Sequence, residues 1–346
     1  METKKKLFLV DAYALIFRGY YAFIKNPRIN SKGVDTSAIM GFTNSLFDVI
    51  KRENPDYIAV CFDKGGSHDR TKIFKEYKAN RDETPEAIKI AVPYIEKILK
   101  SLNIATVVKE GYEADDIIGT IAKKAKQKNL KTYMVTPDKD FAQLVEKDIY
   151  MYRPVFGGGY ETWGIDEVLK KFEINKTSQV IDFLAMKGDS VDNIPGLPGV
   201  GDKTAKKFIS EFGSLEGLFE NTDQLKGKIK EKVEQNKELG ILSKKLATII
   251  TDVPLNFEIE DFKLGVHELE ETKNLFDDLE FRRLSNSLNS IFSTSQETIE
   301  KKNDSKNNGQ FDLFANTERE TISKKNNLII QKVLDGISYK LFEKIM

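Results

Sequence analysis

Hydrophobic residues in the first half of the chain form short β-branched or aromatic runs, separated by longer amphipathic stretches. Four runs predict strands, at residues 7–10, 57–62, 131–135 and 149–152. Three amphipathic stretches predict helices, at residues 37–51, 86–102 and 113–129. Strands that alternate with helices are typical of an α/β fold in which a mostly parallel sheet has helices on both faces.

The second half has a different pattern. Residues 178–290 are helical in pattern, Gly188 predicts the end of a first helix, and a new helix begins near Lys203. Between them, the Pro-Gly-Leu-Pro-Gly-Val-Gly segment at 195–201 predicts a tight loop. We therefore expect a domain at 1–177, an all-helical region at 178–290, and a polar linker or tail at 291–346.

Composition narrows the function classes. The 346 residues carry 54 basic and 54 acidic side chains, and this balance neither favours nor excludes a nucleic-acid partner, because an acidic pocket and a basic face can cancel. One cysteine, Cys61, and two histidines, His68 and His267, are too few for a Cys/His zinc site. No apolar run approaches the roughly 20 residues of a membrane helix. We expect an unexported, cytoplasmic protein without a membrane partner.

Acidic residues gather at the ends of predicted elements, and three of them directly follow strands. The set is Asp11, Asp63, Glu113, Asp115, Asp116, Asp138, Asp140, Asp189 and Asp192. Converging carboxylates repel one another unless cations neutralise them, and hard divalent ions prefer oxygen ligands. The set predicts two or more Mg²⁺ ions, for which Mn²⁺ would substitute.

Each acid taken alone is typical of a helix cap or a solvated turn. A phosphoacceptor site, in which one Asp at a strand end has acidic neighbours, accounts for two of the groups and leaves the others unexplained. The joint pattern favours metal binding.

Basic residues dominate the segment that follows Asp63. Phe74 and Tyr77 are interleaved with them, and the local charge over residues 64–81 is about plus four, from six basic and two acidic residues. The basic residues are Lys64, Arg70, Lys72, Lys75, Lys78 and Arg81. This composition suits a polyanion whose phosphates bind Lys and Arg while its bases stack on aromatic rings. A solvated helix face is the alternative.

A glycine turn in the second half is a candidate phosphate site. Gly199, Val200 and Gly201 expose backbone N–H groups at a helix start, and basic or hydroxyl side chains follow at Lys203, Thr204, Lys206 and Lys207. A simple turn between two helices would have the same sequence. The run at 157–159, three glycines, predicts a hairpin turn instead, and Cys61 lies in a strand and is expected in the core.

These motifs together resemble the 5′ nuclease superfamily of flap endonucleases, and within it the N-terminal 5′→3′ exonuclease domain of bacterial DNA polymerase I, over about residues 5–290. The matching segments are Val10-Asp11, Cys61-Phe62-Asp63, Tyr77-Lys78-Ala79-Asn80-Arg81, Gly111-Tyr112-Glu113-Ala114-Asp115-Asp116, Thr136-Pro137-Asp138-Lys139-Asp140, Gly188-Asp189-Ser190-Val191-Asp192-Asn193-Ile194-Pro195-Gly196, Gly199-Val200-Gly201-Asp202-Lys203-Thr204-Ala205, Glu234-Gln235-Asn236-Lys237 and Leu246-Ala247-Thr248.

The resemblance implies a PIN-like core, a helical arch at about 64–90 that passes a single-stranded 5′ end, and a helix-three-turn-helix at 182–208 that grips duplex DNA. It implies that Tyr77 stacks on a base near the cut, while Lys78 and Arg81 steer and polarise the scissile phosphate. Lys72, Lys75 and the residues at 199–207 would bind DNA. In this family a potassium ion is often held by carbonyls of the glycine-rich loop, which implies such a site at 199–201.

The implied function is structure-specific 5′→3′ exonuclease or flap endonuclease activity, by a two-metal mechanism, on 5′ flaps or RNA primers in DNA replication and repair. The acids up to Asp116 would form the first metal's shell, and those from Asp138 onward would lie nearer the second. No segment after residue 290 is long enough for a polymerase domain. The chain could therefore be a standalone nuclease or a truncated polymerase. The expected partner is a DNA polymerase acting in trans, and the expected location is the nucleoid.

Three alternative functions also stay open: a PIN-type ribonuclease, a non-catalytic DNA-binding scaffold, and a nucleotide-binding domain. The last would need a glycine-rich loop after the first strand, and the residues after Asp11 supply none. In the tail, the segment Gln310, Phe311, Asp312, Leu313 and Phe314 resembles the short peptide by which bacterial proteins hold the sliding clamp. A chance hydrophobic patch is its alternative.

Overall fold

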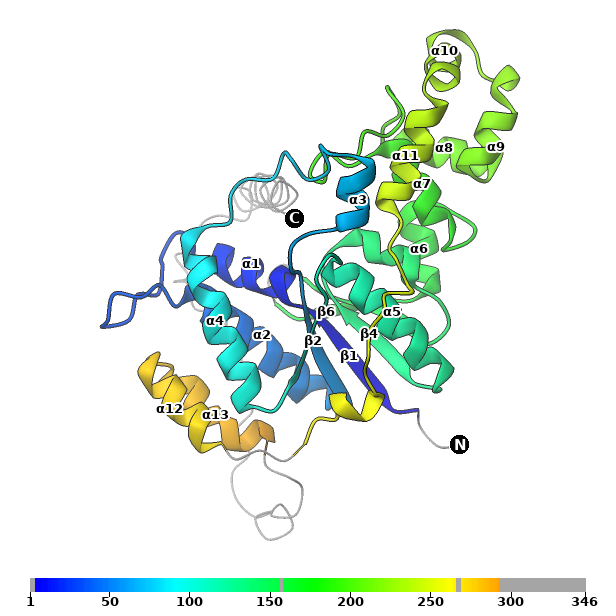
Figure 1. Cartoon of the computed structure of the whole chain (residues 1–346). Helices are drawn as coiled ribbons and strands as arrows, with labels where there is room; N and C mark the ends of the chain where they lie inside the picture. Colours follow the sequence, from blue (N-terminus) through cyan, green and yellow to red (C-terminus); the bar gives the residue numbers. More distant parts are fainter. Residues whose placement is uncertain (1–3, 156–157, 266–268, 293–346) are drawn as a thin grey trace, which may run out of the picture.

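The computed structural model describes residues 4–155, 158–265 and 269–292, which contain a central six-stranded sheet (Figure 1). The strand order is β3-β2-β1-β4-β5-β6. The strands are β1 (Lys6–Asp11), β2 (Tyr57–Phe62), β3 (Ala105–Val108), β4 (Lys131–Val135), β5 (Ile149–Pro154) and β6 (Tyr160–Trp163). All pairs are parallel except β5 with β6. The four predicted strands and the mostly parallel sheet are confirmed. The antiparallel pairing of β5 with β6 agrees with the hairpin predicted at the glycine run, of which Gly157 lies outside the described residues.

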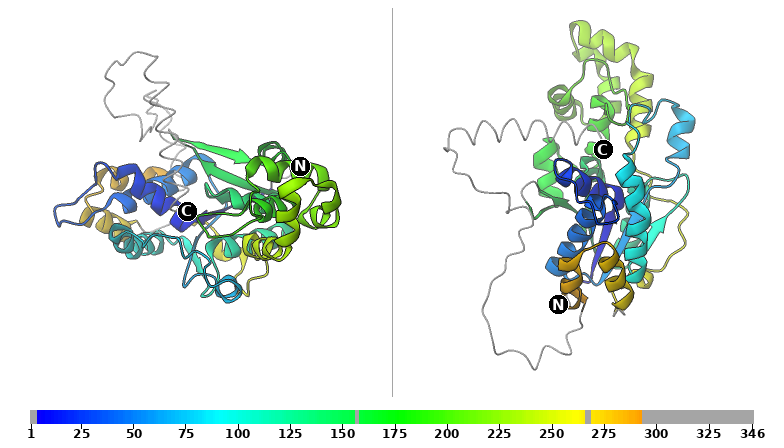
Figure 2. Two further views of the ribbon diagram at one scale, coloured as in Figure 1. Left: turned by 90° about the horizontal axis from the view of Figure 1, so that it is seen from above. Right: turned by 90° about the vertical axis from the view of Figure 1, so that its left-hand side faces the viewer.

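Helices cover both faces of this sheet (Figures 1 and 2). On one face lie α1 (Ala12–Phe23), α2 (Ser37–Glu53) and α4 (Glu86–Ser101), and beyond them α12 (Glu270–Asp278) and α13 (Arg282–Phe292). On the other lie α5 (Ala114–Gln127), the 3-10 helix η1 (Lys139–Leu144) and α6 (Ile165–Phe172). Each face has its own cluster of buried apolar side chains. The three helices predicted in this half are confirmed.

A group of helices stands beyond one end of the sheet (Figure 1). Its members are α7 (Gln179–Lys187), α8 (Asp202–Phe212), α9 (Leu215–Glu220), η2 (Thr222–Gln224), α10 (Gly227–Gln235) and α11 (Lys237–Ala247). Gly188 ends α7 with a φ of +73°, and a non-helical loop connects it to α8, as predicted. After η3 (Ile259–Phe262), α12 and α13 return to pack on the first half, so the stretch 178–290 spans two separate packing environments.

The arch segment, residues 64–90, connects β2 to the first turn of α4. It contains the short helix α3 (His68–Ile73), for which the Ser67 hydroxyl accepts a hydrogen bond from the Arg70 N–H. Turns follow to residue 80, and Lys78 has a φ of +58°. The end of α3 and these turns lie above the carboxyl ends of the strands in Figure 1.

Two glycines set the crossing of α1 and α2. A Cβ added at Gly41 would lie 2.3 Å from the Gly19 Cα, so the helices touch through their backbones. We expect Gly41→Ala to lower the free energy of unfolding by about 1–3 kcal/mol, because the helices must separate. Urea denaturation measures this difference. Gly265→Ala is the control, since its added Cβ meets nothing within 4 Å. An unchanged midpoint in Gly41→Ala would show that the crossing tolerates the methyl group.

No helix in the described part of the chain is long and apolar enough to cross a membrane. The clamp-like peptide at 310–314, and all of the tail beyond residue 292, lie outside the described residues.

Candidate active site

Three of the predicted acids lie at the carboxyl edge of the sheet, at the ends of β1, β2 and β4. Asp11 caps α1 through a 3.2 Å hydrogen bond from the Ala14 N–H, and the Thr136 hydroxyl donates to its second oxygen at 3.0 Å. The same hydroxyl accepts from the Asp138 N–H at 3.3 Å. Thr136 therefore joins Asp11 to the loop that carries Asp138.

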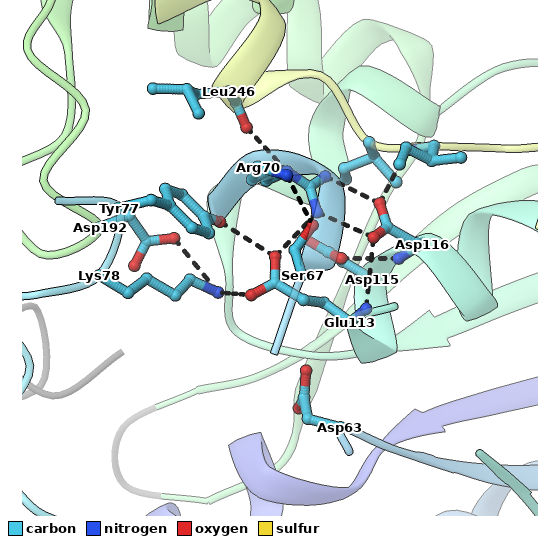
Figure 3. Close-up of polar contacts among 12 residues, drawn as sticks. Asp63, Ser67, Arg70, Tyr77, Lys78, Glu113, Asp115, Asp116, Asp192 and Leu246 are labelled. Carbon is cyan, nitrogen blue, oxygen red and sulfur yellow. Dashed lines mark hydrogen bonds and ion pairs between the residues drawn. The ribbon is translucent and has the colours of Figure 1, made fainter. Parts of the chain in front are cut away.

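The first turn of α5 supplies the densest acidic group. Oxygens of Glu113, Asp115 and Asp116 lie within 4.8 Å of one another and could hold a metal ion. A capping box between Glu113 and Asp116 fixes this turn, and the Ala114 N–H donates to Asp63 at 2.9 Å. Figure 3 shows Asp63 below this turn, pointing toward it. The strand-end acids and the helix-start acids thus share one region.

The arch segment contacts this region through basic side chains (Figure 3). The Lys78 ammonium binds a Glu113 oxygen and lies 3.6 Å from an oxygen of Asp192. Arg81 donates to Asp192 at 2.5 Å, and the Tyr77 hydroxyl donates to Glu113 at 3.0 Å. The three predicted catalytic residues therefore meet the predicted metal ligands. Tyr77 is only 8% exposed, so its stacking on a base stays a prediction.

The remaining acids come from the η1 start and from the loop after α7. Asp138 accepts from the Asp140 N–H at 2.9 Å, and Asp189 accepts from the Val191 N–H at 2.8 Å. Burial and then mutual repulsion raise the pKa of Asp140 well above its usual range, and Asp138 and Asp189 have the largest effects among the neighbouring like charges. Four acids separated by up to 54 positions, Asp138 to Asp192, thus act on one another electrostatically.

Burial is the main cause of raised carboxyl pKa values across the site. It raises the pKa of Asp138 to about 6, and it raises the pKa of Asp63, Asp115 and Asp189 as well. Glu113 is the exception: burial opposes its ionisation, but the charges of Lys78 and Arg70 outweigh burial and lower its pKa. Most of the carboxylates therefore lack sufficient positive charge from the protein itself.

A hard divalent cation fits this donor set. All nine candidate ligands offer carboxylate oxygens, which Mg²⁺ and Mn²⁺ prefer, and a cation would offset the repulsion that helps to raise the pKa values of Asp115 and Asp140. Asp116 differs from the others, because its oxygens already accept four hydrogen bonds, from Arg70 twice, Ile250 and Glu113. The assignment of individual acids to metals stays a prediction.

The pH dependence of stability offers a test at Asp11, whose pKa is raised to about 7 by burial and then by Asp63. Between pH 4 and 7 the folded metal-free protein binds more protons at Asp11 than the unfolded chain does, so this residue lowers stability as pH rises through that window. At pH 8 we expect metal-free Asp11→Asn to exceed the wild type in unfolding free energy by roughly 2–4 kcal/mol.

Thermal and urea unfolding in EDTA at pH 4.5 and pH 8 measure this effect, and the advantage of Asp11→Asn should shrink at the lower pH. The matched control is Asp223→Asn, which makes the same chemical change at an exposed surface acid. An Asp11→Asn protein less stable than the wild type at pH 8 would contradict the raised pKa.

The predicted DNA-binding residues lie on two exposed surfaces. Lys72 and Lys75 are exposed on the arch segment. At the start of α8, Gly201 and Lys203 are exposed, whereas Lys206 pairs with Glu173 and Asp202, and the Val200 side chain is buried. The remaining members, Gly199, Thr204 and Lys207, lie on the same loop and helix. DNA and potassium binding at these positions stay predictions.

Arg70 does not belong to the basic surface to which its sequence position assigned it. It is 3% exposed, and its guanidinium binds Glu113 and Asp116 instead of facing solvent. One sequence signal could have indicated this: Arg70, Phe74 and Tyr77 recur at the i, i+4, i+7 spacing typical of a buried face, although the helix itself ends at Ile73.

Comparison with known proteins identifies the family. Residues 6–173 match the family model of the 5′-3′ exonuclease N-terminal resolvase-like domain, and residues 175–270 match that of the 5′-3′ exonuclease C-terminal SAM fold. The chain belongs to the 5′-3′ exonuclease family, as the sequence motifs predicted.

Two kinds of relatives share this sequence. A 5′-3′ exonuclease of Aquifex aeolicus is 35% identical over 288 residues, which are 83% of this chain and 96% of the relative. DNA polymerase I of Caldicellulosiruptor bescii is 36% identical over 283 residues, 81% of this chain and 33% of the polymerase. DNA polymerase I of Bacillus subtilis is 38% identical over 287 residues, 82% of this chain and 32% of the polymerase. The chain therefore spans about a third of its polymerase relatives.

Solved structures support the fold. The bacteriophage T5 5′-exonuclease with bound zinc superposes with a TM-score of 0.59 at 23% identity, over 80% of this chain and 99% of that one. The catalytic core of Rad2 in complex with DNA substrate gives 0.56 at 17% identity, over 84% and 92%. These neighbours confirm the flap-nuclease fold.

Proposed function

We propose that this chain hydrolyses phosphodiester bonds of DNA at 5′ flaps or 5′ single-stranded ends, as a divalent-metal-dependent nuclease. One observation carries the proposal: buried and half-buried carboxylates from the sheet edge, α5 and the loop after α7 meet beside the basic arch segment. Family membership supports the reaction class, and the Rad2 neighbour was solved with DNA substrate.

The acidic and basic residues of the site would have different roles in this reaction. Asp11, Asp63, Glu113 and Asp115 would hold a first Mg²⁺, and Asp138, Asp140, Asp189 and Asp192 would lie nearer a second. Bound divalent ions supply activation of water and stabilisation of the leaving oxygen. Lys78 and Arg81 would orient the scissile phosphate, since both already reach the acids. The products would be 5′ phosphates.

Exposed cations that lie outside the acidic group would contact the rest of the DNA. Lys72 and Lys75 on the arch segment would contact the single strand, and the 199–207 segment would contact duplex phosphates. The same proposal includes the removal of RNA primers and a role in replication and repair. It also includes a polymerase partner in trans, potassium at the 199–201 loop and a nucleoid location. Clamp binding by 310–314 is a separate proposal on the tail.

The first experiment is cleavage of a 5′-labelled flap duplex by the purified chain, in Mg²⁺ and in EDTA, beside a matched RNA hairpin. We expect magnesium-dependent release of a short 5′ fragment from the flap and no cleavage of the hairpin. Cleavage of the hairpin alone would favour a PIN-type ribonuclease. Binding without cleavage in Mg²⁺ and Mn²⁺ would favour a DNA-binding scaffold.

A further inference from the structure

Arg70 is a buried charge that the proposed reaction does not use. Its guanidinium donates at 2.8 Å to one oxygen of Glu113 and to both oxygens of Asp116, as Figure 3 shows. It also donates to the carbonyls of Leu246, at 3.0 Å, and Thr248, at 2.9 Å. Arg70 therefore joins the first turn of α5 to the chain that leaves α11.

This chain, residues 246–253, we call the strap. Besides Arg70, it is held by the Ile250 N–H to Asp116 at 2.8 Å and the Val253 N–H to Thr120 at 3.1 Å. Gln143 of η1 binds it on both sides, donating to the Ala247 carbonyl and accepting from the Ile249 N–H, each at 2.9 Å. The strap is thus fixed to α5 and η1. Three candidate metal ligands lie in these two elements, and two more directly precede them.

At its other end the strap continues α11, which contacts the glycine-rich loop. The Ser243 hydroxyl accepts from the Gly196 N–H at 2.9 Å, and Lys244 pairs with Asp182 of α7 at 2.6 Å. A continuous series of hydrogen bonds therefore runs from the loop before α8, through α11 and the strap, to Arg70 and the α5 acids.

The geometry of these contacts requires arginine. Five hydrogen bonds leave three nitrogens of one planar group in fixed directions, toward two carboxylates and two carbonyls. A lysine would keep the charge, but its single ammonium offers three donors from one point and cannot reach the four acceptor groups together. If Arg70 only compensated charge, lysine could replace it. If Arg70 positions its partners, lysine could not.

We propose that Arg70 is a positioning residue for the metal centre: it fixes Glu113 and the first turn of α5 in register with the strap, and so with the region that would bind duplex DNA. The rate effect of this role rests on the proposed nuclease function. The effect on metal binding does not, and it can be measured without DNA.

The test uses Arg70→Lys in the full chain, with Mn²⁺ as the metal probe. We expect Mn²⁺ affinity of the free protein, followed by electron paramagnetic resonance, to fall by about ten- to a hundredfold, because residues that orient metal ligands contribute this much. The single-turnover cleavage rate should fall similarly, while flap affinity in EDTA stays within about threefold, since the exposed lysines are untouched. The control is Arg52→Met, which removes a surface arginine paired with Asp48.

Thermal unfolding separates positioning from folding alone. If Arg70→Lys is folded at the assay temperature and binds Mn²⁺ like the wild type, the proposal is overturned, whatever happens to the midpoint. If Arg70→Lys does not fold, Gln143→Ala takes its place, because it loosens the strap without leaving a buried charge unpaired. In that variant an unchanged Mn²⁺ affinity overturns the proposal. A wild type that binds Mn²⁺ but never cleaves DNA would refute the nuclease function and leave the positioning role testable.

Discussion

Asp115→Asn should lower the single-turnover cleavage rate by about a thousandfold or more while leaving the affinity for flap DNA in EDTA within a few fold. The substitution keeps the shape of the side chain and removes one negative charge from the group formed with Glu113 and Asp116. Burial and the charge of Asp116 raise the Asp115 pKa well above its usual range, so a bound cation would favour the ionised form of this carboxyl group. Loss of the charge removes a metal ligand rather than a DNA contact.

The readouts for Asp115→Asn are rapid-quench cleavage with enzyme in excess and fluorescence anisotropy on the same labelled flap. Asp166→Asn is the matched control, an exposed acid in the first turn of α6, and it should behave as the wild type. If DNA affinity falls in parallel with the rate, the hypothesis that the acids bind metal while the cations bind phosphate is contradicted.

The acidic site could be predicted from the sequence because its members are tied to local rules. The carboxyl ends of parallel strands meet at one edge of a sheet, so Asp11, Asp63 and Asp138 had to lie near one another once the strands were recognised. The acids in the first turn of α5 could be grouped in the same way, because the sequence predicts that a helix begins there. These inferences need only short-range patterns and the parallel topology.

Contacts between distant segments could not be predicted in the same way. Arg70 was grouped with exposed cations because its partners at 113, 116, 246 and 248 are separated from it by 43 to 178 positions. The helix α1 was missed because Tyr13, Phe17 and Tyr20 lie half-exposed on its outer side, which hides the amphipathic period. The edge strand β3 has only four residues, too few for a clear alternation.

The other large effect is expected at Lys78, whose ammonium already occupies the space between Glu113 and Asp192. Burial opposes its charge, but the two carboxylates outweigh burial and raise its pKa, so Lys78 stays charged at neutral pH. A phosphate that approaches the acids meets this cation. We expect Lys78→Ala to lower the single-turnover rate by about a hundredfold and to change flap affinity less than threefold. An unchanged rate would refute its role.

Lys72→Ala provides the contrast, because Lys72 is exposed on the same arch segment and makes no contact with the acids that the structure describes. It should weaken flap binding and lower the slope of log affinity against log salt by about one, with little change in the rate at saturating enzyme. A second measurement distinguishes the two lysines without DNA. The Lys78 ammonium competes with a metal for Glu113, so metal-free Lys78→Ala should bind Mn²⁺ more tightly than the wild type, whereas Lys72→Ala should not. Weaker Mn²⁺ binding in Lys78→Ala would mean that the lysine organises the acids rather than standing in for a cation.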